Sequence, residues 1–189
     1  MPDCSDRNVF RPSVLLTTHI PDQHREGETM AATPAIAALE KAGIAHDVHR
    51  YGHDPRSDAY GDEAVAVMTE RLGVAPEQIL KTLVIDLGST LAVAVLPVPA
   101  RLSVKAAAAA LGSSKAVMAQ ARDVTRSTGY VLGGVSPVGQ RTRLPTVVDE
   151  SALAWPMVLC SGGRRGVEIA LAPTDLVAVT DAVTASVLA

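Results

Sequence analysis

The chain has 189 residues, about the length of one domain. Hydrophobic residues make up 48% and charged residues 20% of the sequence, a globular composition that excludes disorder throughout. No apolar run reaches the roughly 18 residues of a membrane helix, and the N-terminus lacks the charged start and apolar core of a secretion signal. We therefore expect a cytoplasmic protein with no membrane partner.

The net charge of −3, from 17 basic and 20 acidic residues, is unevenly distributed. Residues 101–145, the basic segment, carry seven basic side chains opposed only by Asp123. The seven are Arg101, Lys105, Lys115, Arg122, Arg126, Arg141 and Arg143. Such asymmetry can indicate a surface that faces phosphates, although seven solvated surface charges would give the same pattern. Charge alone leaves both interpretations open.

Residues 1–29 differ from the rest of the chain. They contain three prolines, several charges and one short apolar stretch at Val14–Leu16. We interpret them as a flexible extension, or as an artefact of an upstream start codon with Met30 as the working start. The predicted domain then spans residues 30–189. Its first helix begins at Thr33-Pro34, where threonine is a good N-cap and proline fits the first helical position.

Hydrophobic spacing and turn residues predict the elements of the first half of the domain. They are a helix over Pro34–Ala42 stopped by Gly43, a strand over His46–Tyr51, a turn-rich loop to Tyr60, a helix from Gly61 or Asp62 to Gly73, and a β-hairpin over Ile79–Leu87 and Thr90–Val98.

Lys81 has an unusual place in this predicted hairpin. In a strand it lies on the same side as Leu83, Ile85 and Leu87, which is the apolar side. A lysine on that side needs a partner or a function. The alternative is that its stem packs while its amine reaches solvent at the sheet edge.

The second half of the domain continues the mixture of helices and strands. The pattern predicts an Ala-rich helix from Ser103 to Gly112, a helix near Ala119–Ser127, a loop over Gly129–Pro145, strands over Thr146–Asp149, Met157–Ser161 and Gly166–Leu171, and a last helix over roughly Thr174–Val187. Because hairpins occur among the helices, we predict an α+β fold with a mixed sheet.

The sequence shows no familiar nucleophile, cofactor or metal motif. It has no Gly-x-Ser-x-Gly, no Walker-type loop and no dinucleotide fingerprint, so we predict no cofactor. His46, His49 and His53 lack partners at metal-ligand spacing and are interpreted as surface histidines. Two glycine-rich loops, over residues 133–139 and 161–166, could form backbone nests for an anion or could be tight turns. Together with Lys81 and the basic segment, they indicate a pocket for an anionic ligand.

Several short motifs occur in one order along the chain. They are Thr33-Pro34-Ala35, Tyr51-x-His53-Asp54, Tyr60-Gly61-Asp62-Glu63, Lys81-Thr82-Leu83, Ser127-Thr128-Gly129-Tyr130, Gly133-Gly134-Val135-Ser136-Pro137-x-Gly139 and Ser161-Gly162-Gly163-x-Arg165-Gly166. This set resembles the YbaK family of aminoacyl-tRNA deacylases, which are related to the editing domain of prolyl-tRNA synthetase. The likeness covers residues 32–188 and is strongest to the branch that clears cysteine from mischarged tRNA.

The resemblance implies a mixed sheet, partly closed into a barrel and flanked by helices, around a substrate pocket. Lys81 would hold the 3′ end of the tRNA, Gly134 would present its backbone to the ester, and Ser161 would close the pocket. Substrate-binding roles are implied for Tyr51, Tyr60, Thr82, Ser136, Gly162, Gly163 and Glu168. From their charge and position we expect Arg141, Arg143 and Arg165 to bind tRNA. Family members often have phenylalanine at position 60 and aspartate at position 168, where this chain has Tyr60 and Glu168.

The resemblance also implies a mechanism without a protein nucleophile. The thiol of the substrate's own cysteine would attack the ester carbonyl and release the tRNA. We therefore expect a trans-editing deacylase for Cys-tRNA(Pro), and also for Cys-tRNA(Cys), which works beside prolyl-tRNA synthetase and binds no DNA. The alternatives are hydrolysis of Ala- or Pro-tRNA by water and a non-catalytic module that binds tRNA or synthetase.

Overall fold

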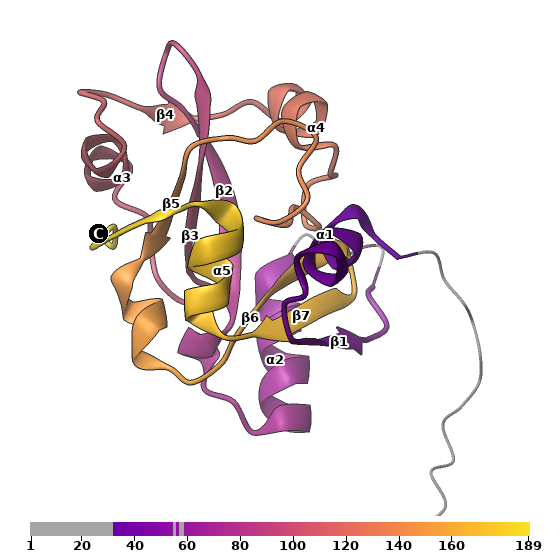
Figure 1. The fold of residues 1–189 in the computed structure, drawn as a ribbon. Helices are drawn as coiled ribbons and strands as arrows, with labels where there is room; N and C mark the ends of the chain where they lie inside the picture. The colour runs from indigo at the N-terminus through magenta and orange to yellow at the C-terminus, as the bar shows by residue number, and fades with distance from the viewer. Residues whose placement is uncertain (1–31, 55, 57–58) are drawn as a thin grey trace, which may run out of the picture. The chain divides into compact units, whose positions relative to one another are not determined.

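The computed structural model describes residues 32–54, 56 and 59–189 (Figure 1). The extension predicted over residues 1–29 lies outside this range. Within it, none of the helices combines the length and apolar character needed to cross a membrane.

Five α-helices occur in the described part of the chain. They are α1 (Pro34–Ala42), α2 (Tyr60–Leu72), α3 (Val104–Ala110), α4 (Ala121–Thr128) and α5 (Pro173–Thr180), with short 3₁₀ helices η1 (Pro76–Gln78) and η2 (Glu150–Ala154). The start and stop signals of α1 act as predicted. The Thr33 hydroxyl accepts a hydrogen bond from the Ile36 N–H, and Gly43 ends the helix with a φ of 68°. Local sequence therefore sets both ends of this helix.

The strands form two open sheets. They are β1 (His46–Arg50), β2 (Leu80–Asp86), β3 (Leu91–Pro97), β4 (Val117–Met118), β5 (Thr146–Asp149), β6 (Val158–Arg164), β7 (Val167–Leu171) and β8 (Val183–Ala185). One sheet has the order β1-β7-β6 and is antiparallel, and the other has the order β4-β2-β3-β5-β8 and is mixed. The predicted α+β class with a mixed sheet is confirmed, and the hairpin of β2 and β3 forms as expected. The sheets are not closed into a barrel.

The predicted last helix over Thr174–Val187 is wrong in its second half. Helix α5 ends at Thr180, and Asp181 follows in the left-handed region with a φ of 52°. The chain then forms β8, which pairs in parallel with β5. The β-branched Val183 and Thr184 suit a strand, and the sheet edge at β5 offers the hydrogen bonds that a longer helix would have made within itself.

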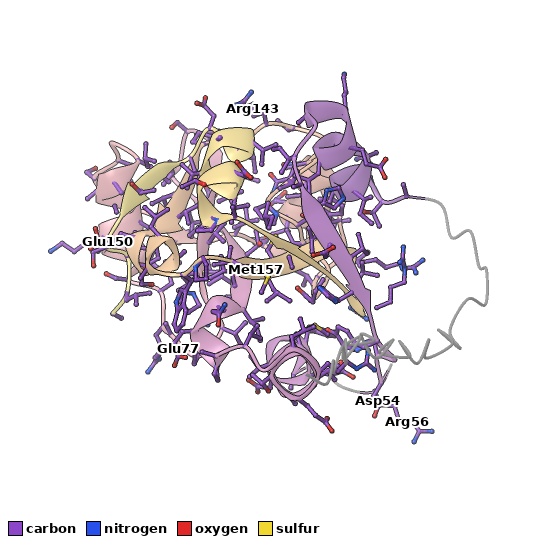
Figure 2. All side chains as sticks on the ribbon, turned by 60° about the horizontal axis from the view of Figure 1, so that its bottom comes forward. Asp54, Arg56, Glu77, Arg143, Glu150 and Met157 are labelled. Atoms are coloured by element: carbon purple, nitrogen blue, oxygen red, sulfur yellow. The ribbon has the colours of Figure 1, made fainter. Side chains whose placement is uncertain are left out.

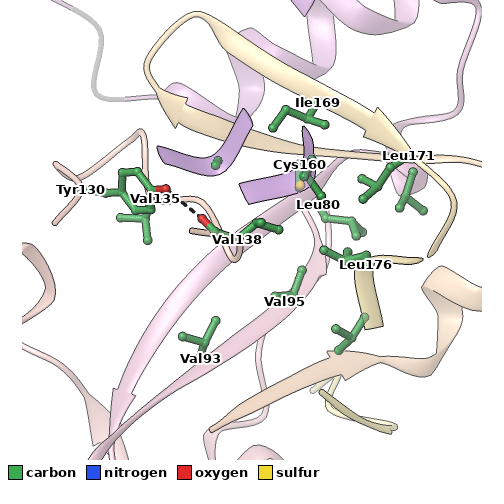
Figure 3. Close-up of a cluster of buried hydrophobic side chains, with 14 of the residues drawn as sticks. Leu80, Val93, Val95, Tyr130, Val135, Val138, Cys160, Ile169, Leu171 and Leu176 are labelled. Carbon is green, nitrogen blue, oxygen red and sulfur yellow. Dashed lines mark hydrogen bonds between the residues drawn. The ribbon is translucent and has the colours of Figure 1, made fainter. Parts of the chain in front are cut away.

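The main hydrophobic core lies between the two sheets and is built almost entirely from aliphatic side chains (Figure 3). Leu80 and Val95 of the larger sheet and Ile169 of the smaller one contribute to it. Tyr130 is its one large aromatic group among the fully buried members, and its hydroxyl donates to the Val138 carbonyl at 2.8 Å. This bond ties the loop after α4 to the core.

Each sheet also has a second, separate apolar face. On the larger sheet, Ile85, Ala92 and Val147 pack against Ala107 of α3. On the smaller sheet, Leu159 and Ala170 pack against Ala64 and Met68 of α2. Helices α1 and α2 therefore cover opposite faces of the smaller sheet, as Figure 1 shows. The start of α2 then lies close to β6, β7 and the beginning of β2, where the site is found.

Candidate functional site

A cavity of about 240 Å³ opens where α2, the start of β2, the loop after α4 and strands β6 and β7 meet. It is smaller than the roughly 300–1,000 Å³ of pockets for drug-sized ligands. Its walls bring together five of the predicted site residues, which come from four different elements. They are Tyr60 from α2, Lys81 and Thr82 from β2, Ser161 from β6 and Glu168 from β7.

The edge of β2 provides one wall of this cavity. Strand β4 pairs with β2 only at Ile85 and Asp86. The Ala119 N–H also donates to Val84 O at 3.0 Å, and just before β2 a bridge joins Ile79 to Leu159. Between them, Lys81 and Thr82 line the cavity and pair with no second strand among the described residues, as at the edge of a sheet.

The Lys81 ammonium is held at the cavity wall by two carbonyl oxygens. Its Nζ donates to Val98 O at 2.9 Å and to Ala100 O at 2.6 Å, both in the turn that follows β3. Burial lowers the pKa of Lys81, while the charge of Asp62 acts in the opposite direction. Because an ammonium has three N–H donors, one remains for a ligand in the cavity.

Two hydroxyl groups of the cavity wall keep hydrogen-bonding capacity. The Oγ of Ser161 accepts from the Gly163 N–H at 3.3 Å, which leaves its own proton to donate. The Oγ1 of Thr82 is buried and has no hydrogen-bond partner among the described residues. Buried polar groups are usually paired, so such an atom in a cavity wall is suited to a ligand.

Glu168 is a buried acid in the same wall. It is 7% exposed, and burial raises the pKa of its carboxyl to about 8. Tyr51 does not line the cavity but lies close enough to be affected by this charge. Burial raises the pKa of the Tyr51 phenol strongly, and Glu168 and Glu63 raise it further.

The loop after α4 lines the cavity through Leu132, Gly133 and Val135 rather than through the residues we singled out. The Gly134 N–H donates to Val131 O at 3.0 Å within a turn, so it is already used. Ser136 is fully buried, and its Oγ accepts from the Val138 N–H at 3.2 Å. The structure thus places Gly134 and Ser136 behind the cavity wall.

Gly162 and Gly163 lie outside the cavity lining and permit close packing. A Cβ at Gly162 would lie 2.7 Å from Cγ1 of Val167, and one at Gly163 would lie 2.7 Å from Cε1 of Tyr130. The carbonyl of Gly162 accepts from the Thr33 hydroxyl at 2.5 Å, which joins the start of α1 to β6. Close approach of neighbouring groups explains the need for glycine at both positions.

Arg165 frames the cavity, whereas the other two predicted arginines lie elsewhere. The Arg165 guanidinium sits 4.4 Å from the centre of the Tyr60 ring, and its Nε donates to Leu132 O at 3.0 Å. Arg141 donates to Arg126 O at 3.2 Å, and exposed Arg143 lies 3.4 Å from Asp181 after α5. Asp54 marks the side of the molecule near the start of α2, because its N–H donates to Glu63 in the first turn of that helix. Figure 2 shows Arg143 on the other side of the molecule from Asp54.

His53 is not the surface residue that we predicted. Its side chain is 13% exposed, its Nδ1 lies 2.6 Å from Oε2 of Glu63, and its ring lies 5.5 Å from that of Tyr60. The hydrogen bond lowers the pKa of Glu63. Since Glu63 belongs to the first turn of α2, the pair fixes the end of the helix that carries Tyr60. The motif Tyr51-x-His53-Asp54 included His53, but the sequence did not show that Glu63, ten residues later, is its partner.

No group of three His, Cys, Asp or Glu side chains within the described ranges is arranged to hold a metal ion. The polar side chains of the cavity wall instead carry the Lys81 ammonium, the Glu168 carboxyl and the hydroxyls of Tyr60, Thr82 and Ser161. These suit a polar organic ligand with an anionic or ester end.

Comparison with known proteins gives consistent results. Residues 62–179 match the model of the aminoacyl-tRNA editing domain. The chain is 32% identical over 155 residues to an Enterococcus faecalis protein named as a Cys-tRNA(Pro)/Cys-tRNA(Cys) deacylase, EbsC, covering 82% of this chain and 92% of that one.

Comparison with solved structures points to the same family. One titled as a trans-editing enzyme for prolyl-tRNA synthetase is 29% identical with a TM-score of 0.71, covering 82% of this chain and 95% of the other. A hypothetical protein matches with 28% identity and the same TM-score, covering 83% of this chain and 100% of the other. With its fold, its cavity and these matches, the chain belongs to the family of aminoacyl-tRNA editing domains.

Proposed function

We propose that this protein is a trans-editing deacylase that removes cysteine from mischarged tRNA(Pro), and also from tRNA(Cys), in the cytoplasm beside prolyl-tRNA synthetase. The observation that carries the proposal is a small cavity with ester-binding donors and no activated protein nucleophile. Its described lining contains neither cysteine nor histidine. Cys160 is fully buried in the main core, where burial raises its pKa strongly. The relative from Enterococcus faecalis carries the same activity in its name.

In this proposal the substrate supplies the nucleophile. The cysteinyl sulphur attacks its own ester carbonyl, a cyclic thioester forms, and the terminal ribose of the tRNA leaves. Lys81 binds the 3′ end of the tRNA with its remaining N–H, and Ser161 and Thr82 orient the ester. Orientation of this kind can lower a barrier by up to roughly 7–11 kcal/mol.

The backbone of the loop after α4 stabilises the oxyanion. Gly133 and Val135 line the cavity, whereas the Gly134 N–H is engaged with Val131, so we assign the oxyanion to the backbone of Gly133 and Val135 rather than to Gly134. Loss of one oxyanion donor typically costs about 3–4 kcal/mol of transition-state stabilisation.

The test is a deacylation assay with tRNA(Pro) charged with cysteine, alanine, proline or serine. We expect rapid loss of cysteine and slow loss of the other three. Fast clearance of alanine or proline would favour hydrolysis by bound water. No clearance of any of the four, with tRNA still bound, would favour a non-catalytic module.

Replacing Gly133 by alanine should lower the deacylation rate about 10- to 100-fold. A Cβ there would lie 2.5 Å from Cδ2 of Tyr60, so the ring must move, and a displacement of about 1 Å can cost that much. Gly43→Ala is the matched control, because Gly43 also has a positive φ but open space around it. Gly43→Ala should lose about 1–2 kcal/mol of stability, measured by urea unfolding, and Gly133→Ala should lose more because the clash with Tyr60 adds to the same backbone strain. Only Gly133→Ala should lose activity. Equal activities would show that Tyr60 does not shape the substrate site.

Reversing Arg141 and Arg143 to glutamate should weaken tRNA binding and lower the salt dependence of binding. If each arginine contacts one phosphate, the slope of log K against log salt should fall by about 2. The control is Lys41→Glu with Arg71→Glu, two exposed positions outside the basic segment. An unchanged slope in the first variant would mean that the basic segment is only a solvated surface.

A further inference from the structure

Three side chains form a row across the smaller sheet. In the strand register, Ser161 of β6 lies opposite Glu168 of β7, and Glu168 lies opposite His49 of β1. Directly opposed residues of antiparallel strands project from the same face. This is the face covered by α2, since Leu159 and Ala170 project from it against that helix. The row therefore runs from the cavity wall at Ser161 toward the outer strand.

Glu168, the middle member, is a buried carboxyl without a partner. It is 7% exposed, lines the cavity, and makes no hydrogen bond or ion pair with its side chain to another described residue. Burying an unpaired charge is costly, so such a group tends to be held neutral. Five titratable groups lie around it on the surrounding elements. They are His49 and Tyr51 from the region of β1, Tyr60 from α2, Lys81 from β2 and Cys160 from β6, whose pKa the Glu168 charge helps to raise.

We propose that Glu168 is the general base of the reaction, a role that rests on the function proposed above. The Glu168 carboxylate takes the proton of the substrate thiol while the sulphur forms a bond to the ester carbonyl carbon. The bond from that carbon to the ribose oxygen then breaks. Glu168 returns the proton to the departing oxygen, so the products are a cyclic cysteine thioester and tRNA with a free hydroxyl. No water, oxidant or cofactor is consumed.

The chemistry of Glu168 matches that of the proton it would move. Its carboxyl has a pKa of about 8, and a thiol ionises near pH 8.5. Proton transfer between such groups is close to balanced in both directions, as one residue that serves first as base and then as acid requires. A carboxyl with an ordinary pKa would be a much weaker base for a thiol. Burial in this wall thus gives Glu168 the strength that the reaction needs.

The test compares single-turnover deacylation of Cys-tRNA(Pro) by the wild type, Glu168→Gln and Glu168→Asp across pH 6–10. General bases typically contribute about 10²- to 10⁴-fold, so Glu168→Gln should lose at least about 100-fold in rate at pH 7. The wild-type rate should pass through a maximum near pH 8, where carboxylate and thiol coexist. The Gln variant should instead rise to a plateau above the thiol pKa. Glu168→Asp should retain part of the rate, and Glu77→Gln, at an exposed site, should match the wild type.

A second measurement follows the ionisation of Glu168 without reference to activity. The Glu168 carboxyl loses its proton near pH 4.5 in the unfolded chain and near pH 8 in the folded protein. Between these pH values the folded state therefore binds one more proton than the unfolded state. The wild type should therefore lose stability relative to Glu168→Gln as the pH rises from about 4.5 to 8, measured by urea unfolding.

The outcomes separate the two proposals. If Glu168→Gln clears Cys-tRNA(Pro) within threefold of the wild-type rate, Glu168 is not the base, although the deacylase function stands. If only KM rises and the pH profile keeps its shape, Glu168 binds the substrate, for example its ammonium, and is not the base. If the wild type clears no Cys-tRNA(Pro), the proposed function itself has failed.

Discussion

Cys-tRNA(Pro) should be cleared more than about 200-fold faster than Ser-tRNA(Pro), although the two substrates differ only in sulphur against oxygen. A pocket that recognises side-chain size separates such near-isosteres by roughly 10–200-fold at best. The chemical difference is larger, because a thiol ionises near pH 8.5 and is an intrinsically strong nucleophile, whereas a hydroxyl stays protonated. The ratio of the two single-turnover rates at pH 7.5 measures this effect.

The rate with Cys-tRNA should also depend on pH in a defined direction. Between pH 6 and 7 the pH lies below the pKa values of both the thiol and Glu168. The thiol then stays protonated, while the fraction of Glu168 present as carboxylate, and with it the rate, rises nearly tenfold with each pH unit. Alkylation of the substrate sulphur should abolish the reaction. Comparable rates on Cys- and Ser-tRNA, or a flat profile from pH 6 to 7, would contradict attack by the substrate thiol.

Removal of the Lys81 ammonium should reduce kcat/KM for deacylation about 10- to 150-fold, because a hydrogen bond from a charged donor typically contributes about 1.5–3 kcal/mol. Lys81→Met is the informative variant, because methionine keeps the apolar stem and loses the charge. Both carbonyl partners, Val98 and Ala100, lie in the turn after β3, so the variant should keep its fold while that turn loses two hydrogen bonds. The value of kcat/KM for deacylation measures the first effect, and urea unfolding measures the second.

Two further variants show what the lysine contributes. Lys41→Met, at an exposed position of α1, should leave the rate unchanged. Lys81→Ala removes the stem as well and should lose both activity and stability. If Lys81→Met were fully active while Lys81→Ala unfolded, Lys81 would serve only to hold the turn.

The sequence by itself determined the local elements, because their signals lie within a few residues. Thr33, Pro34 and Gly43 fix the two ends of α1, and Ser103 accepts from the Ala106 N–H at the start of α3. The turn at Gly88-Ser89 sets the pairing of β2 with β3. The ordered motifs also indicated the family, and eight of their residues line the cavity: Tyr60, Gly61, Lys81, Thr82, Leu83, Gly133, Val135 and Ser161.

Only the tertiary structure decided which of these residues face the substrate cavity. Glycine at 134, 162 or 163 looks the same in sequence whether it serves a ligand or a close contact, and here the first is used in a turn and the others pack against Val167 and Tyr130. The His53–Glu63 pair, the pairing of β8 with β5 and the burial of Glu168 opposite Ser161 likewise depend on segments that are distant along the chain. Short-range steric effects and hydrogen bonds can be predicted from the spacing of residues along the chain. Contacts between distant strands depend instead on how both sheets pack, and this packing sets the burial, and hence the pKa, of Glu168.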